Sequence, residues 1–419
     1  MQFKSASSWW PLCLFALAGA AHADTDLGPY SFGVSEQVRH ESNVTRAIES
    51  DRQADWVSTT ELNAAVDQAL GRNQFIANGA FDINRYKKRD DLNANEYHAN
   101  TAFNWNTVND LSGSIGGDSR RRQYFYGFEG DSAPSGASRS LVRNLQTDNH
   151  LFTNIQLGGV SRWTIFAGAD ANQRKYSNET FTALGERQWS AHGGTSYATS
   201  PDLSFGVTGS ATHGVYPGFR LDPASDALHD SFDMKSVDLT TKWQASGVSR
   251  LDATLGYTRA EYALQPDSHY VNGSLDWTWN PPSHISVVLG LSRDSSTDTS
   301  TGSIAATNDL AGLSINNTAH LAVTYELTAK TSLVASTQFT QRRYSGAVLP
   351  DTNGAQTPGV SGTNRTWLVG LNAHFLPTRT TDVACGVSRE VRTADSALEA
   401  ITPAYSDNIV LCSAAIKFD

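Results

Sequence analysis

The sequence predicts an all-β protein, a closed antiparallel transmembrane β-barrel of about 18 strands, with 16 as the alternative. Three observations lead to this prediction: long segments of alternating apolar and polar residues, short turns that alternate with longer polar loops, and a secretion signal. The composition agrees, because hydrophobic residues make up only 39% of the 419 residues. That share is low for a globular core but suits a barrel with a polar interior.

The alternation of apolar and polar residues is clearest over residues 313–327. There Leu321 and Val323 share one face, while His320 and Thr324 share the other, as the two-residue period of a strand requires. Segments of this kind repeat along the whole chain and exceed the usual strand length of about 5–6 residues in a β-sandwich. They therefore favour tilted strands that cross a membrane.

Short turns alternate with longer polar loops from one end of the chain to the other. This asymmetry is typical of outer-membrane barrels, and it places both termini on the periplasmic side, where the turns lie. The predicted strands cover residues 30–40, 56–69, 73–86, 92–107, 110–125, 144–158, 161–176, 186–199, 202–213, 232–246, 248–262, 267–280, 283–294, 313–328, 331–344, 363–376, 380–391 and 408–418.

The N-terminus predicts a signal peptide over residues 1–23, followed by the barrel over residues 24–419. Lys4 precedes an apolar run over residues 9–19, and Ala21-His22-Ala23 forms a small-x-small cleavage signal. A membrane anchor would need roughly 20 apolar residues. We therefore expect secretion and residence in the bacterial outer membrane.

Charge and the final strand indicate which partners to expect. The net charge of −10 argues against a nucleic-acid partner. We expect outer-membrane lipids and lipopolysaccharide around the barrel. The last predicted strand ends at Phe418, which Asp419 follows, and it resembles the signal that the barrel assembly machinery reads, in which the aromatic residue is usually the last.

A short basic and aromatic motif recurs where alternate strands reach the loop side. By strand parity, one set of its arginines faces the lumen: Arg120, Arg122, Arg174 and Arg342. A second set faces outward: Arg85, Arg121, Arg259 and Arg343. The motif ends in tyrosines that we expect to form an interfacial aromatic girdle: Tyr86, Tyr124, Tyr176, Tyr262 and Tyr344. Tryptophans near the short turns predict the opposite girdle: Trp105, Trp163, Trp243, Trp277 and Trp279.

Two hypotheses explain the lumenal arginines. In the first, they form a basic ring near the mouth of the pore that selects or guides anionic solutes. In the second, they brace the wall by pairing with lumenal acids, and the outward arginines contact lipopolysaccharide phosphates. The candidate acids are Asp118, Asp170, Asp238 and Glu326.

Catalysis, cofactors and metal ions have little support in the sequence, so we expect a protein that is not an enzyme. The histidines with lumenal parity lie on separate strands, and none accompanies a serine in a nucleophile elbow: His98, His192, His320 and His374. We interpret them as solvated side chains of the lumen or the rim. An outer-membrane hydrolase remains the third functional alternative.

Cys385 and Cys412 are expected to form a disulfide. They lie on the last two predicted strands, which form a hairpin, and they share the parity of lipid-facing residues. An exported protein reaches an oxidising compartment where such bonds persist. The alternative is a pair of inert thiols. The remaining cysteine, Cys13, leaves with the signal peptide.

Three segments carry a family resemblance: Gly33 to Asn43, Leu111 to Asp118 running into Arg120–Arg122, and Cys412 to Phe418. The chain resembles the EpsL-type outer-membrane barrels of exopolysaccharide biosynthesis operons, within the β-barrel porin 2 group. The resemblance implies a conduit or accessory in exopolysaccharide export, with the secreted polysaccharide and its inner-membrane machinery as partners. The runner-up is a general diffusion porin for small solutes, which would show a large and poorly selective conductance.

Overall fold

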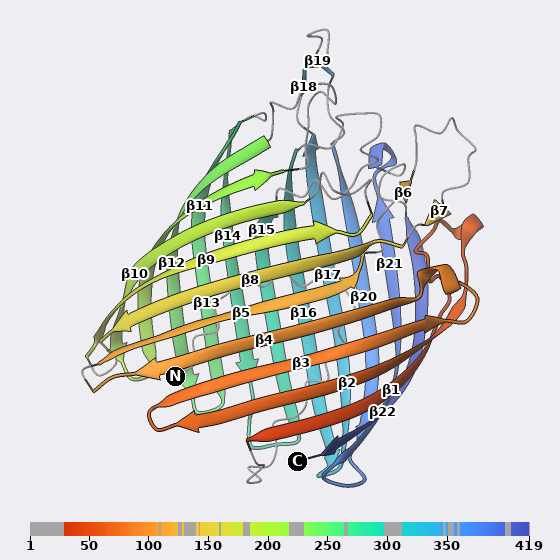
Figure 1. Ribbon diagram of the computed structural model, residues 1–419, viewed down its shortest axis with the longest axis horizontal. Helices are drawn as coiled ribbons and strands as arrows, with labels where there is room; N and C mark the ends of the chain where they lie inside the picture. Colours follow the sequence, from red (N-terminus) through yellow and green to blue (C-terminus); the bar gives the residue numbers. More distant parts are fainter. Residues whose placement is uncertain are drawn as a thin grey trace.

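In the computed structural model the chain folds into one closed antiparallel barrel of 18 strands (Figure 1). The structure describes residues 29–108, 110–124, 128–129, 140–141, 143–158, 161–178, 185–217, 230–263, 267–296, 312–346, 349–350, 356–357, 361–398 and 404–418. The predicted signal peptide lies outside the described residues. No described helix is long and apolar enough to cross a membrane.

The barrel strands range from 12 to 17 residues in length. They are β1 (Tyr30–Glu41), β2 (Asp55–Leu70), β3 (Asn73–Tyr86), β4 (Ala94–Asn106), β5 (Leu111–Gln123), β8 (Leu145–Leu157), β9 (Trp163–Tyr176), β10 (Glu186–Ser200), β11 (Leu203–Tyr216), β12 (Asp230–Ser246), β13 (Ser249–Tyr262), β14 (Ser268–Trp279), β15 (Ile285–Ser296), β16 (Gly312–Thr328), β17 (Thr331–Gly346), β20 (Gly362–Phe375), β21 (Thr381–Ala394) and β22 (Tyr405–Phe418). Shorter elements lie in the loop-side connections: β6 (Phe128–Glu129), β7 (Ser140–Leu141), β18 (Leu349–Pro350), β19 (Gln356–Thr357), and the 3-10 helices η1 (Glu49–Asp51), η2 (Asp90–Leu92) and η4 (Ser396–Leu398).

Each barrel strand pairs with the barrel strands before and after it, and β1 pairs with β22 to close the cylinder. At this closure Phe32 lies opposite Phe418, and Glu41 lies opposite Ile409. Closure leaves no open sheet edge, which lipid could not satisfy with hydrogen bonds. The prediction of 18 strands is thereby confirmed, and the alternative of 16 is not.

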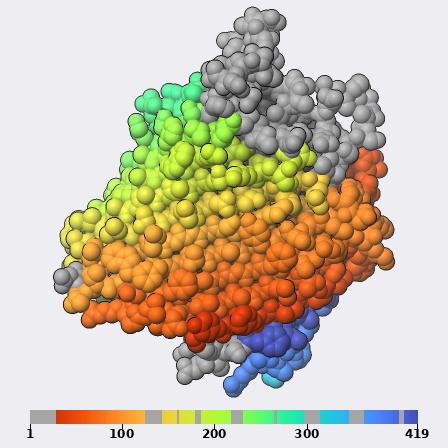
Figure 2. Space-filling model, in the orientation of Figure 1, coloured from red at the N-terminus to blue at the C-terminus, as the bar shows by residue number. Residues whose placement is uncertain are grey.

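Side chains alternate between the outer surface and the lumen. On β11, Phe205 and Val207 are exposed on the outside, while Thr208 and Ser210 have the opposite parity and face the lumen. Strands β1–β5 and β8–β10 form a continuous outer surface (Figure 2). An apolar outer face on a closed barrel requires a lipid environment, and the protein accordingly resides in the bacterial outer membrane.

The short turns lie at the lower end of the barrel in Figure 1. The turn between β2 and β3 has two residues, and Gly71 adopts a φ of 67° that glycine tolerates without strain. Trp163 and Trp243 face outward at this end and are exposed, as expected for an interfacial girdle.

The interfacial role predicted for the loop-side tyrosines is wrong. Tyr86 lies opposite Val57 on the lumenal side, and Tyr344 lies opposite Ser314; all four are buried. Strand register and ring packing turn the others inward as well: Tyr124, Tyr176 and Tyr262. The physical reason is parity, because each of these tyrosines has the parity of the lumenal residues on its own strand.

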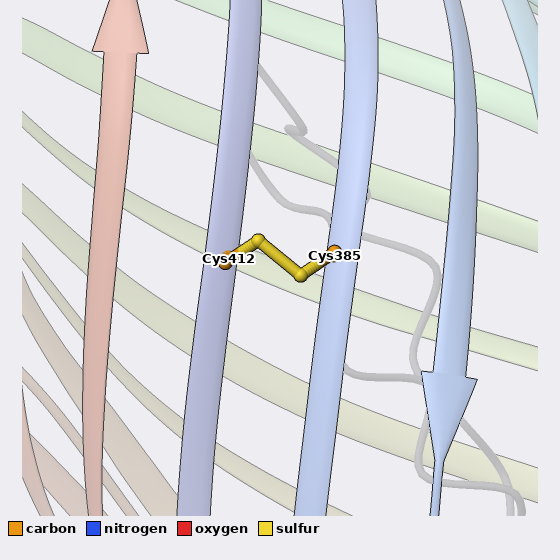
Figure 3. Close-up of a disulfide and its surroundings, with 2 residues drawn as sticks. All are labelled: Cys385 and Cys412. Carbon is orange, nitrogen blue, oxygen red and sulfur yellow. A yellow bond between two sulfur atoms is a disulfide. The ribbon is translucent and has the colours of Figure 1, made fainter.

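The last hairpin carries a disulfide on its outer face (Figure 3). Cys385 on β21 lies directly opposite Cys412 on β22, and their Cα atoms are 4.1 Å apart. This spacing is close to the roughly 4.5 Å of a non-hydrogen-bonded antiparallel pair. The bond joins the last two strands beside the closure with β1.

Candidate functional site

Arg120 and Arg122 lie near the loop-side end of β5 and point into the lumen. Their register partners on β8 are Asp148 and Gln146. The outward parity on β5 is marked by Ile115, which is 58% exposed. Two guanidinium groups therefore stand on the same lumenal face, two residues apart, near the mouth of the barrel.

Neither Arg120 nor Arg122 forms an ion pair or hydrogen bond with another described residue. On β8, the neighbouring acid Asp148 is engaged elsewhere, and on β4 Glu96 attracts both arginines without forming an ion pair with either. The Asp148 carboxylate accepts hydrogen bonds from Arg174 Nε at 2.9 Å and from Gln146 Nε2 at 2.6 Å. The two charges on β5 therefore remain accessible to the lumen.

Arg174 on β9 braces the wall. Its guanidinium lies 2.9 Å from the carboxylate of Asp148 on β8 and 3.9 Å from that of Glu186 on β10. These contacts link three neighbouring strands. Of the four arginines predicted to face the lumen, Arg174 therefore fits the bracing hypothesis, since it forms ion pairs with described acids.

Arg342 lies on the far side of the lumen from the other three. Its Nε donates to Asn316 Oδ1 at 2.7 Å. Its strand, β17, is eight of the 18 strand positions away from β5, counted through β4, β3, β2, β1, β22, β21 and β20. The four arginines thus all face the lumen near its mouth, but they do not form one contiguous cluster.

An acidic cluster adjoins the β5 arginines. Glu61 on β2 lies opposite Asp82 on β3, and Asp82 lies opposite Glu96 on β4. The next strand is β5, where Arg120 is the register partner of the β4 residue His98. The wall therefore carries carboxylates and guanidinium groups side by side, which sequence reasoning did not identify.

A histidine and carboxylate network crosses β5, β8, β9 and β10. His150 contacts Asp118 at 2.9 Å and Asp170 at 3.1 Å, an arrangement that suits the doubly protonated ring because carboxylates only accept. Asp170 also contacts His192 at 3.2 Å and accepts a hydrogen bond from Ser190. The serine faces the carboxylate and not a histidine, so no nucleophile–base pair is formed. Strand parity could have identified His150, since it shares the parity of Asp148.

The histidine network does not bring the other sequence-predicted histidines together. His98, His320 and His374 remain on separate strands, β4, β16 and β20. Among the described residues, no group of three or more His, Cys, Asp or Glu is arranged to hold a metal ion.

The first loop-side connection folds against the lumenal wall near the barrel closure. Arg46 has a left-handed φ of 50°, and its Nε lies 3.6 Å from Glu390 on β21, with both side chains buried. The Asn43 backbone N–H donates to Asp407 on β22 at 2.8 Å. The sequence did not predict these contacts, because a loop has no periodicity that orients its side chains.

A small apolar core fixes the neighbouring connection. Val44, Val57, Tyr86 and Leu92 are buried together. The connection after β3 is also held by Asp55, whose carboxylate accepts the backbone N–H groups of residues 88 and 89. The rim above β1–β4 is thus a packed structure.

The same connection carries an exposed ion pair outside the membrane-spanning strands. Arg89 donates two hydrogen bonds to Asp91, at 2.8 and 2.7 Å. The bonds from this guanidinium lower the pKa of the Asp91 carboxyl below its usual value, because they stabilise the charged form.

Comparison with known proteins finds similar solved structures and no related sequence family. No protein-family model matches the sequence, and no curated protein matches it. OccK2 (OpdF) of Pseudomonas aeruginosa is similar at 13% identity and a TM-score of 0.47, covering 93% of this chain and 98% of that one. OpdK of the same organism is similar at 9% identity and a TM-score of 0.44, covering 93% of this chain and 99% of that one. The FrpB iron transporter of Neisseria meningitidis is similar at 10% identity and a TM-score of 0.47. The match covers 87% of this chain and 62% of the FrpB chain.

Proposed function

We propose that the barrel conducts small hydrophilic solutes across the outer membrane and that Arg120 and Arg122 give anionic solutes a binding step at its mouth. The observation that carries this proposal is the pair of lumenal guanidinium groups without an ion pair among the described residues. A polar wall lets water and solute enter, and weak contacts let a solute leave again, as conduction requires.

The spacing of the two arginines suits a carboxylate or a phosphate. Residues two apart on a strand are about 7 Å apart and point the same way. A guanidinium presents a planar fork of donors that matches the oxygens of such groups. Asp148 is held by Arg174 and Gln146, and Glu96 on β4 attracts both arginines without forming an ion pair with either. The acidic cluster of Glu61, Asp82 and Glu96 lies on one side only, so the local field changes sign across the β4–β5 boundary.

Planar-bilayer recording of the purified barrel tests this function. The wild type should open channels, and the reversal potential in a salt gradient should give its ion preference. Arg120→Gln combined with Arg122→Gln should keep the conductance and shift the preference toward cations. Absence of any ion flux above the bare bilayer would contradict the channel.

The matched control is Arg121→Gln combined with Lys175→Gln, which removes two charges from the outer face of the same region. This variant should keep the wild-type reversal potential, because its charges do not face the lumen. An unchanged reversal potential in the lumenal variant would refute the binding step while leaving the channel itself intact. All variants should migrate differently on a gel before and after boiling, as folded barrels do.

Exopolysaccharide export stays a prediction that rests on the sequence resemblance. A polymer conduit and a small-solute porin differ in what they pass. Liposomes that contain the barrel should swell rapidly in small sugars if it is a porin. Loss of secreted polymer in a strain lacking the protein, with no swelling in liposomes, would favour the export role.

A further inference from the structure

The outer face of the barrel carries basic side chains close to the loop-side ends of its strands. Parity and register turn these residues outward: Arg85, Arg121, Lys175, Arg187, Lys235, Arg259, Arg293, Arg343, Arg365 and Arg389. On the described strands the outward acids are Glu36, Asp233 and Glu261. Four of these cations are the arginines predicted from the sequence to face outward: Arg85, Arg121, Arg259 and Arg343.

The turn-side end of the outer face differs in chemistry. Trp163 and Trp243 lie there, and the described strands turn no lysine or arginine outward at that end. A barrel whose described strands turn cations outward at one lipid interface and not at the other is matched to a membrane whose two leaflets differ. The basic end suits the leaflet with anionic headgroups.

Three of the outward cations form a close cluster on β5, β9 and β10. Arg121 and Lys175 are both register partners of Thr147 on β8, so their backbones are about 10 Å apart across two strand spacings. Arg187 pairs with Gln173 and is therefore a diagonal neighbour of Lys175, at about 7–8 Å. Arg121, Lys175 and Arg187 form no ion pair or hydrogen bond with any other described residue.

Apolar side chains lie directly below this cluster on the outer face. Trp189 follows Arg187 by two residues and is 52% exposed, and Leu151 on β8 is 65% exposed. Cations above and an apolar surface beneath correspond to the two parts of a lipid, its headgroup and its acyl chains.

We propose that Arg121, Lys175 and Arg187 bind the phosphate groups of a phosphorylated glycolipid in the outer leaflet, while its acyl chains pack on Trp189 and Leu151. Like charges held together at a lipid interface repel each other unless anions lie between them. Phosphate oxygens supply those anions and accept the donors of both arginine and lysine. This inference concerns the outer face and is independent of what the lumen conducts.

Native mass spectrometry of the full barrel in detergent tests the site with three lipid probes: bis-phosphorylated lipid A, dephosphorylated lipid A and phosphatidylglycerol. The wild type should hold phosphorylated lipid A about tenfold or more tightly than the dephosphorylated form, given the attraction of each cation for an anionic headgroup. The variant R121Q/K175Q/R187Q should lose that preference. Equal binding of phosphatidylglycerol and phosphorylated lipid A would overturn the assignment to a glycolipid.

The sequence offers a matched control on the same strand. R120Q/R122Q removes two charges that face the lumen and should keep wild-type lipid binding. If the triple variant does not fold, as judged by its gel shift on boiling, R121Q and K175Q are measured singly, and each should weaken binding of phosphorylated lipid A. Wild-type binding by the folded triple variant or by both single variants would overturn the proposal. So would an equal loss in R120Q/R122Q.

Discussion

Arginine side chains have different surroundings in two regions of the lumenal wall, one beside the closure between β1 and β22 and the other on β5. Beside the closure, Arg46 of the first loop-side connection lies against Glu390 on β21. The Arg392 guanidinium on β21 lies 4.4 Å from the ring centre of Tyr405 on β22, and all four side chains are buried. On β5, Arg120 and Arg122 face the lumen and form no ion pair or ring contact with a described residue, although Glu96 on β4 attracts both. The same side chain therefore packs the wall on one side and leaves an accessible charge on the other.

The difference arises from neighbours that the strand pattern does not specify. Near the closure, residues 43–47 fold inward and bury the acids that they meet. Beside β5, Asp148 on β8 is turned toward Arg174 on the far side of its strand, and Glu96 on β4 attracts Arg120 and Arg122 without an ion pair. Strand parity sets which residues face the lumen, and local partners decide whether a charge is available.

Breaking the buried pair at the closure should have the largest effect on stability. Glu390→Ala leaves the Arg46 guanidinium buried opposite an uncharged side chain, which typically costs about 3–5 kcal/mol. Urea unfolding of the detergent-solubilised barrel measures this cost. The comparison variant, Arg120→Ala with Arg122→Ala, should cost less than about 1 kcal/mol. Similar losses for the two variants would remove the distinction between the two sides.

The disulfide should contribute somewhat less to the free energy of unfolding than the buried pair at the closure does. Cys385 and Cys412 are separated by 27 residues, and closing a loop of this size restricts the unfolded chain by about 3 kcal/mol. The variant C385A/C412A should unfold at a lower urea concentration, by that amount of free energy. The wild type under reducing conditions should behave in the same way. Labelling of both cysteines in the unfolded, unreduced protein would show that the bond is absent.

The exposed ion pair of Arg89 and Asp91 on the rim should have the smallest effect on stability. Because Arg89 lowers the pKa of Asp91, the pair stabilises the fold above the usual aspartate pKa of about 3.9. That stabilisation is lost as the pH falls through the lowered value. Arg89→Gln should therefore cost less than about 1 kcal/mol at pH 7, and the difference from wild type should vanish in acid. A larger difference in acid than at pH 7 would contradict this assignment.

The sequence predicted the parts of the molecule that follow a two-residue period. Strand number, closure and the orientation of Arg120 and Arg342 are of this kind. Strand parity also turns Tyr86 and Tyr344 toward the lumen. Their interpretation as an aromatic girdle, which placed them at the lipid interface, disregarded this parity and was wrong. The contacts of Arg46 and the turn of Asp148 toward Arg174 depend on loop conformation and on rotamers. Neither leaves a trace in the sequence pattern.

The comparison between unpaired and braced arginines is tested most directly by ion selectivity at equal charge loss. Reversal potentials in a salt gradient would be measured for R120Q/R122Q and for R174Q/R342Q, each lacking two lumenal charges. Arg120 and Arg122 form no ion pair with a described residue and can attract anions, whereas Arg174 is held by Asp148 and Glu186 and Arg342 donates to Asn316. We therefore predict the larger shift toward cations in R120Q/R122Q. Equal shifts in the two variants would contradict the account, because charge number and not pairing would then set the selectivity.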